Sequence, residues 1–146
     1  MKIWFDMDNT LNLLYDIPGW LDMLHSDDPT PYAIAKPRIN LSRLARYLNR
    51  AQAMGHEIGV ISWLSKNSTP EYDALVTSAK MYWLSRHLPS VKWDEIHIVS
   101  YGRNKWEICG TGILFDDEAR NRNAWGGDAY EPDEIFDVLM QIVQAG

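Results

Sequence analysis

The residue types best suited to chemistry stand in the segment Asp6-Met7-Asp8-Asn9-Thr10. This segment follows the apolar run 2–5, so both carboxylates leave the end of a predicted strand and can turn toward one site. Two unpaired carboxylates repel each other, and each raises the pKa of the other. A hard divalent cation such as Mg2+ removes this repulsion and accepts oxygen ligands, including a backbone carbonyl. Taken alone, the segment fits a metal site and equally fits a strand-to-loop turn with Asx hydrogen bonds.

A second acidic pair, Asp116-Asp117, directly follows the apolar run Thr111–Phe115. Asp117 can cap a helix that starts near Glu118, but this leaves Asp116 without a structural purpose. Adjacent carboxylates behind a buried strand are poorly explained by packing. Metal ligation is therefore the favoured interpretation of this pair.

Two further residues stand where they could bind an anion. Ser62 follows the apolar residues 58–61, and its hydroxyl could donate a hydrogen bond to a phosphoryl oxygen. Lys105 begins a short predicted helix, and an ammonium beside carboxylates would keep an attacking aspartate ionised. Each also has an ordinary interpretation, because a serine after a strand is typical of turns and a lysine is typical of solvated surfaces.

The elements that must position these residues alternate between strand-like and helix-like segments, which predicts a mostly parallel sheet flanked by helices. The predicted strands are Lys2–Phe5, Glu57–Ile61, Glu95–Val99 and Thr111–Phe115. Each is followed by a polar residue, and these residues are Asp6, Ser62, Ser100 and Asp116. Ligands of open parallel α/β sheets bind at the carboxyl ends of the strands, so we expect these side chains to meet.

The helical pattern is equally regular outside one segment. The predicted helices cover residues 41–54, 70–88, 105–110, 118–125 and 132–144. The sequence Ser68-Thr69-Pro70-Glu71 indicates a capping box at the start of the second, and Asn40 and Asn104 can cap the first and third. Residues 11–40 contain four prolines and leave room for at most one short helix, near Gly19–His25.

Composition limits the class of protein. With 146 residues and 46% hydrophobic residues, the chain predicts one globular domain over 1–146. Cys109 is the single cysteine, and the histidines show no metal-binding spacing. The net charge of −6 argues against extended nucleic-acid binding. The absence of a signal-peptide pattern and of a long apolar run predicts a cytoplasmic protein without a membrane partner.

Taken together, DxDxT, Ser, Lys and Asp-Asp, each near the end of a predicted strand, resemble the motifs of the haloacid dehalogenase (HAD) superfamily of phosphohydrolases. The resemblance spans residues 2–145 and implies a three-layer Rossmann-like HAD fold. Asn9 stands where the family usually has glycine, although asparagine also tolerates a left-handed turn. Response-regulator receivers also use Asp, Ser/Thr and Lys, but they phosphorylate an Asp after the third strand, where this chain has Ser100.

The resemblance implies a role for each motif residue. Asp6 would attack phosphorus and form an aspartyl-phosphate, and Asp8 would act as general acid and then as general base. The implied catalytic residues are Asp6, Asp8, Ser62 and Lys105, and the implied substrate-binding residues are Thr10, Ser62, Trp63 and Lys105. The implied Mg2+ ligands are Asp6, Asp8 through its backbone carbonyl, Asp116 and Asp117.

The size of the insertions bears on the substrate. Residues 11–40 are long enough for a flap or minimal cap but not for a folded cap domain. The chain is similar in this respect to polynucleotide 3'-phosphatase domains, and its Leu-Phe-Asp-Asp motif is similar to that of 5'-deoxyribonucleotidases. We therefore expect an Mg2+-dependent phosphomonoesterase acting on a nucleotide or nucleic-acid end, with Trp63 and Trp20 as candidate stacking platforms. Three alternatives stay open: an inactive HAD scaffold used for binding or regulation, a phosphatase of small metabolites or phosphoproteins, and an enzyme that transfers the phosphoryl group to an acceptor other than water.

Overall fold

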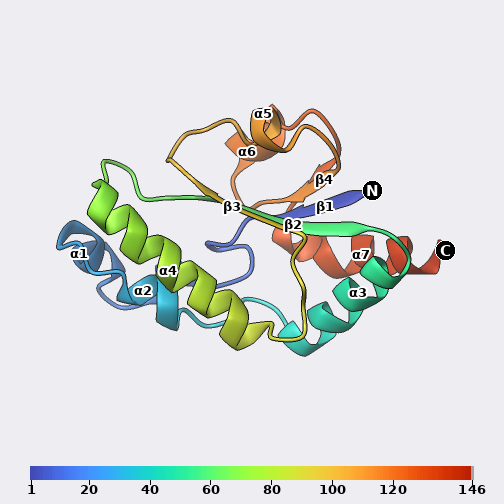
Figure 1. Ribbon diagram of the computed structural model, residues 1–146, viewed down its shortest axis with the longest axis horizontal. Coiled ribbons are helices and arrows are strands. Elements are labelled where there is room, and N and C mark those ends of the chain that lie inside the picture. Colours follow the sequence, from blue (N-terminus) through green and yellow to red (C-terminus); the bar gives the residue numbers. More distant parts are fainter. Residues whose placement is uncertain (146) are drawn as a thin grey trace.

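Five parallel strands form one sheet in the computed structural model, which describes residues 1–145 (Figure 1). The strands are β1 (Lys2–Phe5), β2 (Glu57–Trp63), β3 (Glu95–Val99), β4 (Ile113–Phe115) and β5 (Ala129–Tyr130). Their order across the sheet is β3-β2-β1-β4-β5, so β1 lies between β2 and β4. Parallel pairing brings the carboxyl ends of all strands to one edge of the sheet.

Helices cover both faces of the sheet, which gives the predicted three-layer, Rossmann-like α/β fold (Figure 1). One face carries α3 (Leu41–Ala53), α4 (Pro70–His87) and α7 (Ile135–Gln144). The opposite face carries α5 (Lys105–Cys109) and α6 (Ala119–Ala124). The remaining helical elements are α1 (Trp20–His25), α2 (Thr30–Ile34) and the 3-10 helices η1 (Leu14–Asp16) and η2 (Pro132–Glu134). Within residues 1–145, no helix combines the length and apolar character needed to cross a bilayer.

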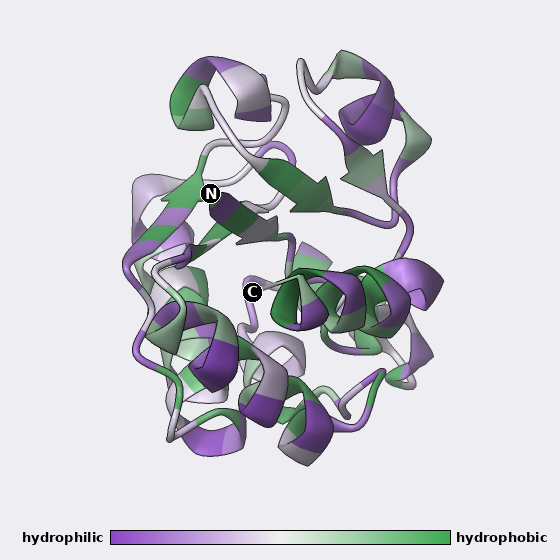
Figure 2. Ribbon diagram, turned by 90° about the vertical axis from the view of Figure 1, so that its right-hand side faces the viewer, coloured by the Kyte–Doolittle hydropathy of each residue, from purple (hydrophilic) through white to green (hydrophobic). Residues whose placement is uncertain are grey.

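Successive side chains of the strands point to opposite faces, and each face has its own hydrophobic cluster. Phe5, Val60 and Phe115 are fully buried beneath α3, α4 and α7. Trp4 and Leu114 point the other way and pack with residues of α5 and with Trp125, which directly follows α6. Figure 2 shows largely hydrophobic strands, and helices that carry both hydrophobic and hydrophilic residues.

Trp4 fits into the sheet because its neighbour on β2 has no side chain. A Cβ atom at Gly59 would come within 2.4 Å of the Trp4 ring, so the indole lies where any other residue would clash. The indole Nε1 donates a hydrogen bond to the Thr111 carbonyl at 2.9 Å. The close approach explains a glycine in the middle of a buried strand.

Side-chain caps fix the helix starts, with one correction to the prediction. Asn40 and Asn104 accept hydrogen bonds from the backbone N–H of Arg43 and Glu107, as predicted. The N-cap of α4 is Thr69, whose Oγ1 accepts from the Tyr72 N–H at 3.2 Å. The prediction of a capping box starting at residue 68 was therefore wrong by one position, because Pro70 occupies the first helical position that it favours.

The strand boundaries also differ from the prediction. β2 continues through Ser62 and Trp63, because β3 pairs with it as far as Val99. Ser62 is thus inside the strand rather than just beyond it. β4 starts only at Ile113, because Gly112 has φ +96°. The short edge strand β5 was not predicted, since a two-residue strand leaves no periodicity in the sequence.

Residues 11–40 contain more helix than the single short one predicted. They form η1, α1 and α2, and α2 packs beside α4 (Figure 1). Leu14 and Tyr32 share a hydrophobic cluster with Tyr72, Val76 and Ala79, which come from α4. This contact with α4 supplies the burial that such short helices need.

Candidate active site

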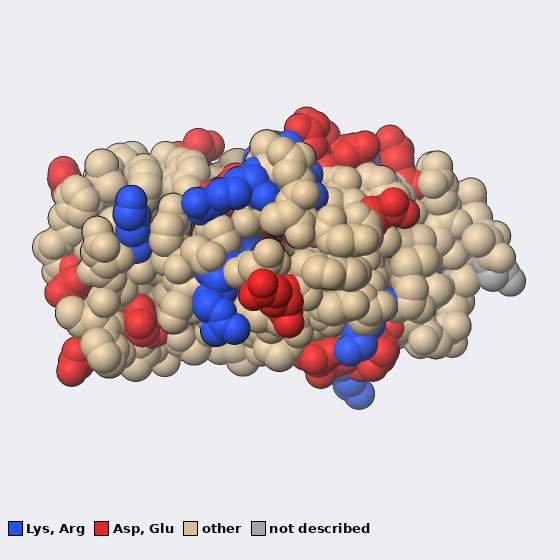
Figure 3. Space-filling model, turned by 90° about the horizontal axis from the view of Figure 1, so that it is seen from above, with Lys and Arg blue, Asp and Glu red and all other residues tan. Residues whose placement is uncertain are grey.

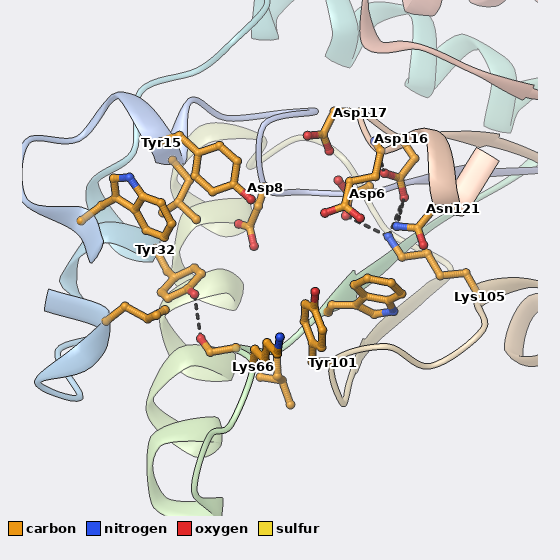
Figure 4. A pocket seen from close by; sticks show the side chains of 17 residues that line it. Asp6, Asp8, Tyr15, Tyr32, Lys66, Tyr101, Lys105, Asp116, Asp117 and Asn121 are labelled. Carbon is orange, nitrogen blue, oxygen red and sulfur yellow. Dashed lines mark hydrogen bonds and ion pairs between the residues drawn. The ribbon is translucent and has the colours of Figure 1, made fainter. Parts of the chain in front are cut away.

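A pocket lies at the carboxyl edge of the sheet, between residues 14–32 on one side and α5 and α6 on the other (Figure 4). Its charged and aromatic lining residues are Asp6, Asp8, Tyr15, Trp20, Tyr32, Trp63, Lys66, Tyr101, Lys105, Asp116, Asp117 and Glu118. The pocket therefore joins the acidic motifs from both ends of the sequence with aromatic side chains from the segments between them.

Three carboxylates converge in this pocket. Asp6 follows β1, and Asp116 and Asp117 follow β4, the strand beside it. One oxygen of each lies within 4.8 Å of the others. Asp6 and Asp116 are buried and Asp117 is half-buried, so little water screens their mutual repulsion. The structure thus brings together the two acidic motifs that the sequence places 110 residues apart.

Lys105 supplies the positive charge beside this cluster. Its Nζ donates hydrogen bonds to Asp6 Oδ1 at 2.9 Å and Asp116 Oδ2 at 2.7 Å. Burial acts to lower the pKa of Lys105, but the two carboxylates outweigh burial and raise the pKa above its ordinary value. The ammonium therefore stays charged, and two of its three N–H groups are used.

A single ammonium does not neutralise three carboxylates. Burial first, and the charge of Asp6 second, raise the pKa of Asp116 to about 6 and that of Asp117 to about 8. Hydrogen bonds from Asn121 Nδ2 and the Glu118 N–H hold the Asp116 carboxylate in place. A surplus of clustered carboxylate oxygens matches the hard oxygen ligands of Mg2+, so these residues fit such an ion.

Thr10 ties the two acidic segments together rather than facing the pocket. Its fully buried Oγ1 donates to Asp6 Oδ2 at 2.9 Å and accepts from the Asp117 N–H at 3.1 Å. Its predicted role in substrate binding stays a prediction. Asn9, just before Thr10, has φ +61°, the left-handed conformation expected of it.

Asp8 and Ser62 meet at a residue that the sequence analysis did not select. The Nζ of Lys80, on α4, donates to Asp8 Oδ2 at 2.9 Å, Ser62 Oγ at 2.7 Å and the Trp63 carbonyl at 2.7 Å. The Asp8 side chain therefore points away from the three-carboxylate cluster. Lys80 could have been noticed, because it interrupts the apolar stripe of α4 four residues after Val76.

Aromatic rings form two walls of the pocket. Tyr15 and Trp20 pack at 4.7 Å between centroids on one side, with their ring planes tilted by 33°. Trp63 and Tyr101 pack at 5.1 Å on the other, and the Arg120 guanidinium lies 4.7 Å from the Trp63 ring. Both tryptophans expected to serve as stacking platforms, Trp20 and Trp63, thus line the pocket.

Comparison with known proteins extends to the fold alone. No family model and no curated protein sequence matches the chain. A chain in the solved structure of the Pnkp1/Rnl/Hen1 complex is similar over 89% of this chain, with a TM-score of 0.56 and 16% sequence identity. This protein spans less than half of that chain, 44%. A crystal structure of a protein from Vibrio cholerae is 18% identical and covers 99% of this chain and 98% of its own, with a TM-score of 0.46. The first likeness, at this identity, shows a shared Rossmann-like α/β fold.

Proposed function

We propose that this protein is a phosphomonoesterase of the HAD type that depends on Mg2+ and forms an aspartyl-phosphate on Asp6. The observation that carries the proposal is the convergence of Asp6, Asp116 and Asp117 around one point beside the Lys105 ammonium. Similarity to a chain of the Pnkp1/Rnl/Hen1 complex is compatible with it.

In the first step, a carboxylate oxygen of Asp6 attacks phosphorus, and the bond from phosphorus to the leaving oxygen breaks. Asp8, which lines the same pocket two residues later, donates its proton to the leaving oxygen. The remaining N–H of Lys105 is available to a phosphoryl oxygen in this step.

In the second step, water attacks phosphorus and the bond to Asp6 breaks, which releases phosphate. Asp8 accepts the proton of that water. Asp6, Asp116 and Asp117 would hold Mg2+, which neutralises charge on the phosphoryl group and the nucleophile when bound.

The test is release of 4-nitrophenolate from 4-nitrophenyl phosphate, with Mg2+ and with EDTA. We expect activity with Mg2+ alone, and a loss of about 1,000-fold or more in Asp6→Asn, because the nucleophile is gone. Asp27→Asn is the control, since Asp27 is exposed and outside this pocket. Equal rates in Asp6→Asn and the wild type would refute the proposal. Phosphate-ester binding without turnover would favour a binding module instead.

We further propose that the substrate is a nucleotide or a nucleic-acid end. The two aromatic walls can stack a base while the phosphate reaches Asp6. On the face seen from above, lysine and arginine side chains lie in small groups among acidic ones (Figure 3). Such a surface suits one terminal phosphate better than a long backbone.

A panel of nucleoside 5'- and 3'-monophosphates, phosphorylated oligonucleotides and glycerol 2-phosphate tests the substrate class. Trp63→Leu removes one stacking contact. We therefore expect kcat/KM for nucleotides to fall by about 10-fold, and kcat/KM for glycerol 2-phosphate to change little. Tyr82→Leu, which removes an exposed ring outside the pocket, is the matched control. Equal losses on both substrate types would remove the stacking argument.

A further inference from the structure

Lys80 is a fully buried lysine in the middle of α4, and the proposed chemistry does not use it. Its side chain is 0% exposed, and its nearest charged partner is Asp8, at 2.9 Å. The Tyr32 ring lies 5.2 Å from its Nζ on the other side. An ammonium removed from water is unfavourable unless its charge and its hydrogen bonds are compensated.

All three N–H groups of Lys80 are already donated. The acceptors are Asp8 Oδ2, Ser62 Oγ and the Trp63 carbonyl, at 2.9, 2.7 and 2.7 Å. Lys80 also does not line the pocket, whereas Lys105 does. A group with no free donor and no access to the pocket cannot bind a phosphoryl oxygen.

The three acceptors belong to two different strand ends. Asp8 follows β1, while Ser62 and Trp63 close β2. Ser62 is fully buried and does not line the pocket, so its hydroxyl links Lys80 to the end of β2. The Asp8 carboxylate is held by Lys80 at the pocket and is 20% exposed there.

We propose that Lys80 is a positioning residue that fixes Asp8 for proton transfer by tying it to the end of β2 through Ser62 and Trp63. The proposal rests on the proposed phosphatase function. Without Lys80, the Asp8 side chain loses its buried anchor and samples other rotamers, so proton transfer slows while the carboxylate cluster stays intact. Lys80 thus acts through Asp8 and not on the substrate.

The test compares two leaving groups in Lys80→Met, which keeps the side-chain length without its charge. An alkoxide leaves poorly without a proton, so we expect turnover of glycerol 2-phosphate to fall by about 100-fold. 4-Nitrophenolate leaves without a proton, so phosphoenzyme still forms, but its hydrolysis needs Asp8 as base. We therefore expect a burst of up to one nitrophenolate per enzyme, a trapped phosphoenzyme, and a KM close to that of the wild type.

A purely structural role predicts something different, namely equal losses on both substrates without a burst. That result, or wild-type rates in Lys80→Met, would overturn the proposal. The double variant Asp8→Asn/Lys80→Met separates the cases further. If Lys80 acts through Asp8, adding Lys80→Met to Asp8→Asn changes the rate little, and losses that multiply would contradict the proposal.

Folding is checked first by thermal unfolding with and without Mg2+, because Lys80→Met leaves the three-carboxylate cluster untouched. If the methionine variant does not fold, Lys80→Gln retains a polar end with two N–H donors and is expected to show the same dependence on leaving group. A wild type without Mg2+-dependent turnover would refute the phosphatase function itself. An active wild type with an unaffected Lys80→Met would refute only the role of Lys80.

Discussion

Single hydrogen bonds decide where the carboxylates of this site point. Lys105 orients Asp6 and Asp116 from α5, and Thr10 orients Asp6 and the Asp117 backbone from the opposite side. Each of these polar contacts is buried or half-buried, and a donor or acceptor left without a partner there destabilises the folded state. The geometry of the cluster therefore depends on neutral side chains as much as on charged ones.

Replacement of Thr10 by valine tests this dependence. Thr10→Val keeps the shape but removes the acceptor of the Asp117 N–H and the donor to Asp6. We expect the Mg2+ concentration for half-maximal activity to rise, and the free energy of unfolding to fall by about 1–3 kcal/mol. Thr10→Ser keeps the hydroxyl and should retain wild-type Mg2+ dependence. Identical Mg2+ titrations for the valine and serine variants would contradict the assignment.

The residues of the site differ in how visible they are in the sequence. Asp6, Asp116 and Asp117 could be predicted because each follows an apolar run whose end a parallel sheet brings to one edge. Lys80 could not be assigned a partner, because its contacts with Asp8 and Ser62 exist only once α4 has packed beside β2. The local sequence pattern predicts where the strands end, but not which helix contributes a side chain at those ends.

At the scale of elements, α4 connects the site to the segment that covers it. Its buried side includes Lys80 beneath Asp8, and Tyr72 and Val76 beneath residues 11–40. The residue at which α4 starts therefore determines which of its side chains make both sets of contacts. The start is set by Thr69, whose side chain caps the helix.

Two neighbouring hydroxyls allow a matched test of that start. Thr69→Ala removes the cap and is expected to cost about 1 kcal/mol in the free energy of unfolding. Ser68→Ala should cost little, because the Ser68 hydroxyl contacts only the Thr69 carbonyl, at 3.3 Å. Chemical denaturation of both variants checks the difference. A larger loss in Ser68→Ala would place the helix start one residue earlier.

Elements could be predicted from sequence where their own residues determine them. The bounds of α3 and α4 were predicted within one or two residues. In α3, the apolar periodicity and the Asn40 cap agree, and in α4, Pro70 marks the start. The helices of residues 11–40 and the edge strand β5 are too short to be stable alone, and their neighbours stabilise them. Such elements leave a weak signal in the sequence.

At the scale of the whole molecule, the acidic cluster opposes folding when no cation is bound. Folding takes the pKa values of Asp116 and Asp117 from 3.8 to about 6 and about 8. Between about pH 4 and about pH 8, the folded chain therefore binds more protons at these two carboxylates than the unfolded chain does. The free energy of unfolding therefore falls as the pH rises from about 4 to about 8.

Thermal unfolding in EDTA and in Mg2+ over this pH range checks the prediction. In EDTA, we expect Tm to fall with pH across the interval because of these two groups. In saturating Mg2+, we expect Tm to rise by about 5 °C or more at pH 8, and by much less at pH 5, where protons compete for the same oxygens. In Asp116→Asn, most of the Mg2+ effect should be lost. A Mg2+ shift that is the same at both pH values would count against a carboxylate site.

The central position of β1 in the sheet also affects when the sheet can form during translation. β1 is synthesised before both of its partners, and one of them, β4, is made only when residues 113–115 are translated. Until then an apolar strand has an open edge, which is a binding site for chaperones and for other nascent chains. Asp116 and Asp117 directly follow β4, so a nascent chain can assemble the three-carboxylate cluster only after β4 has been made.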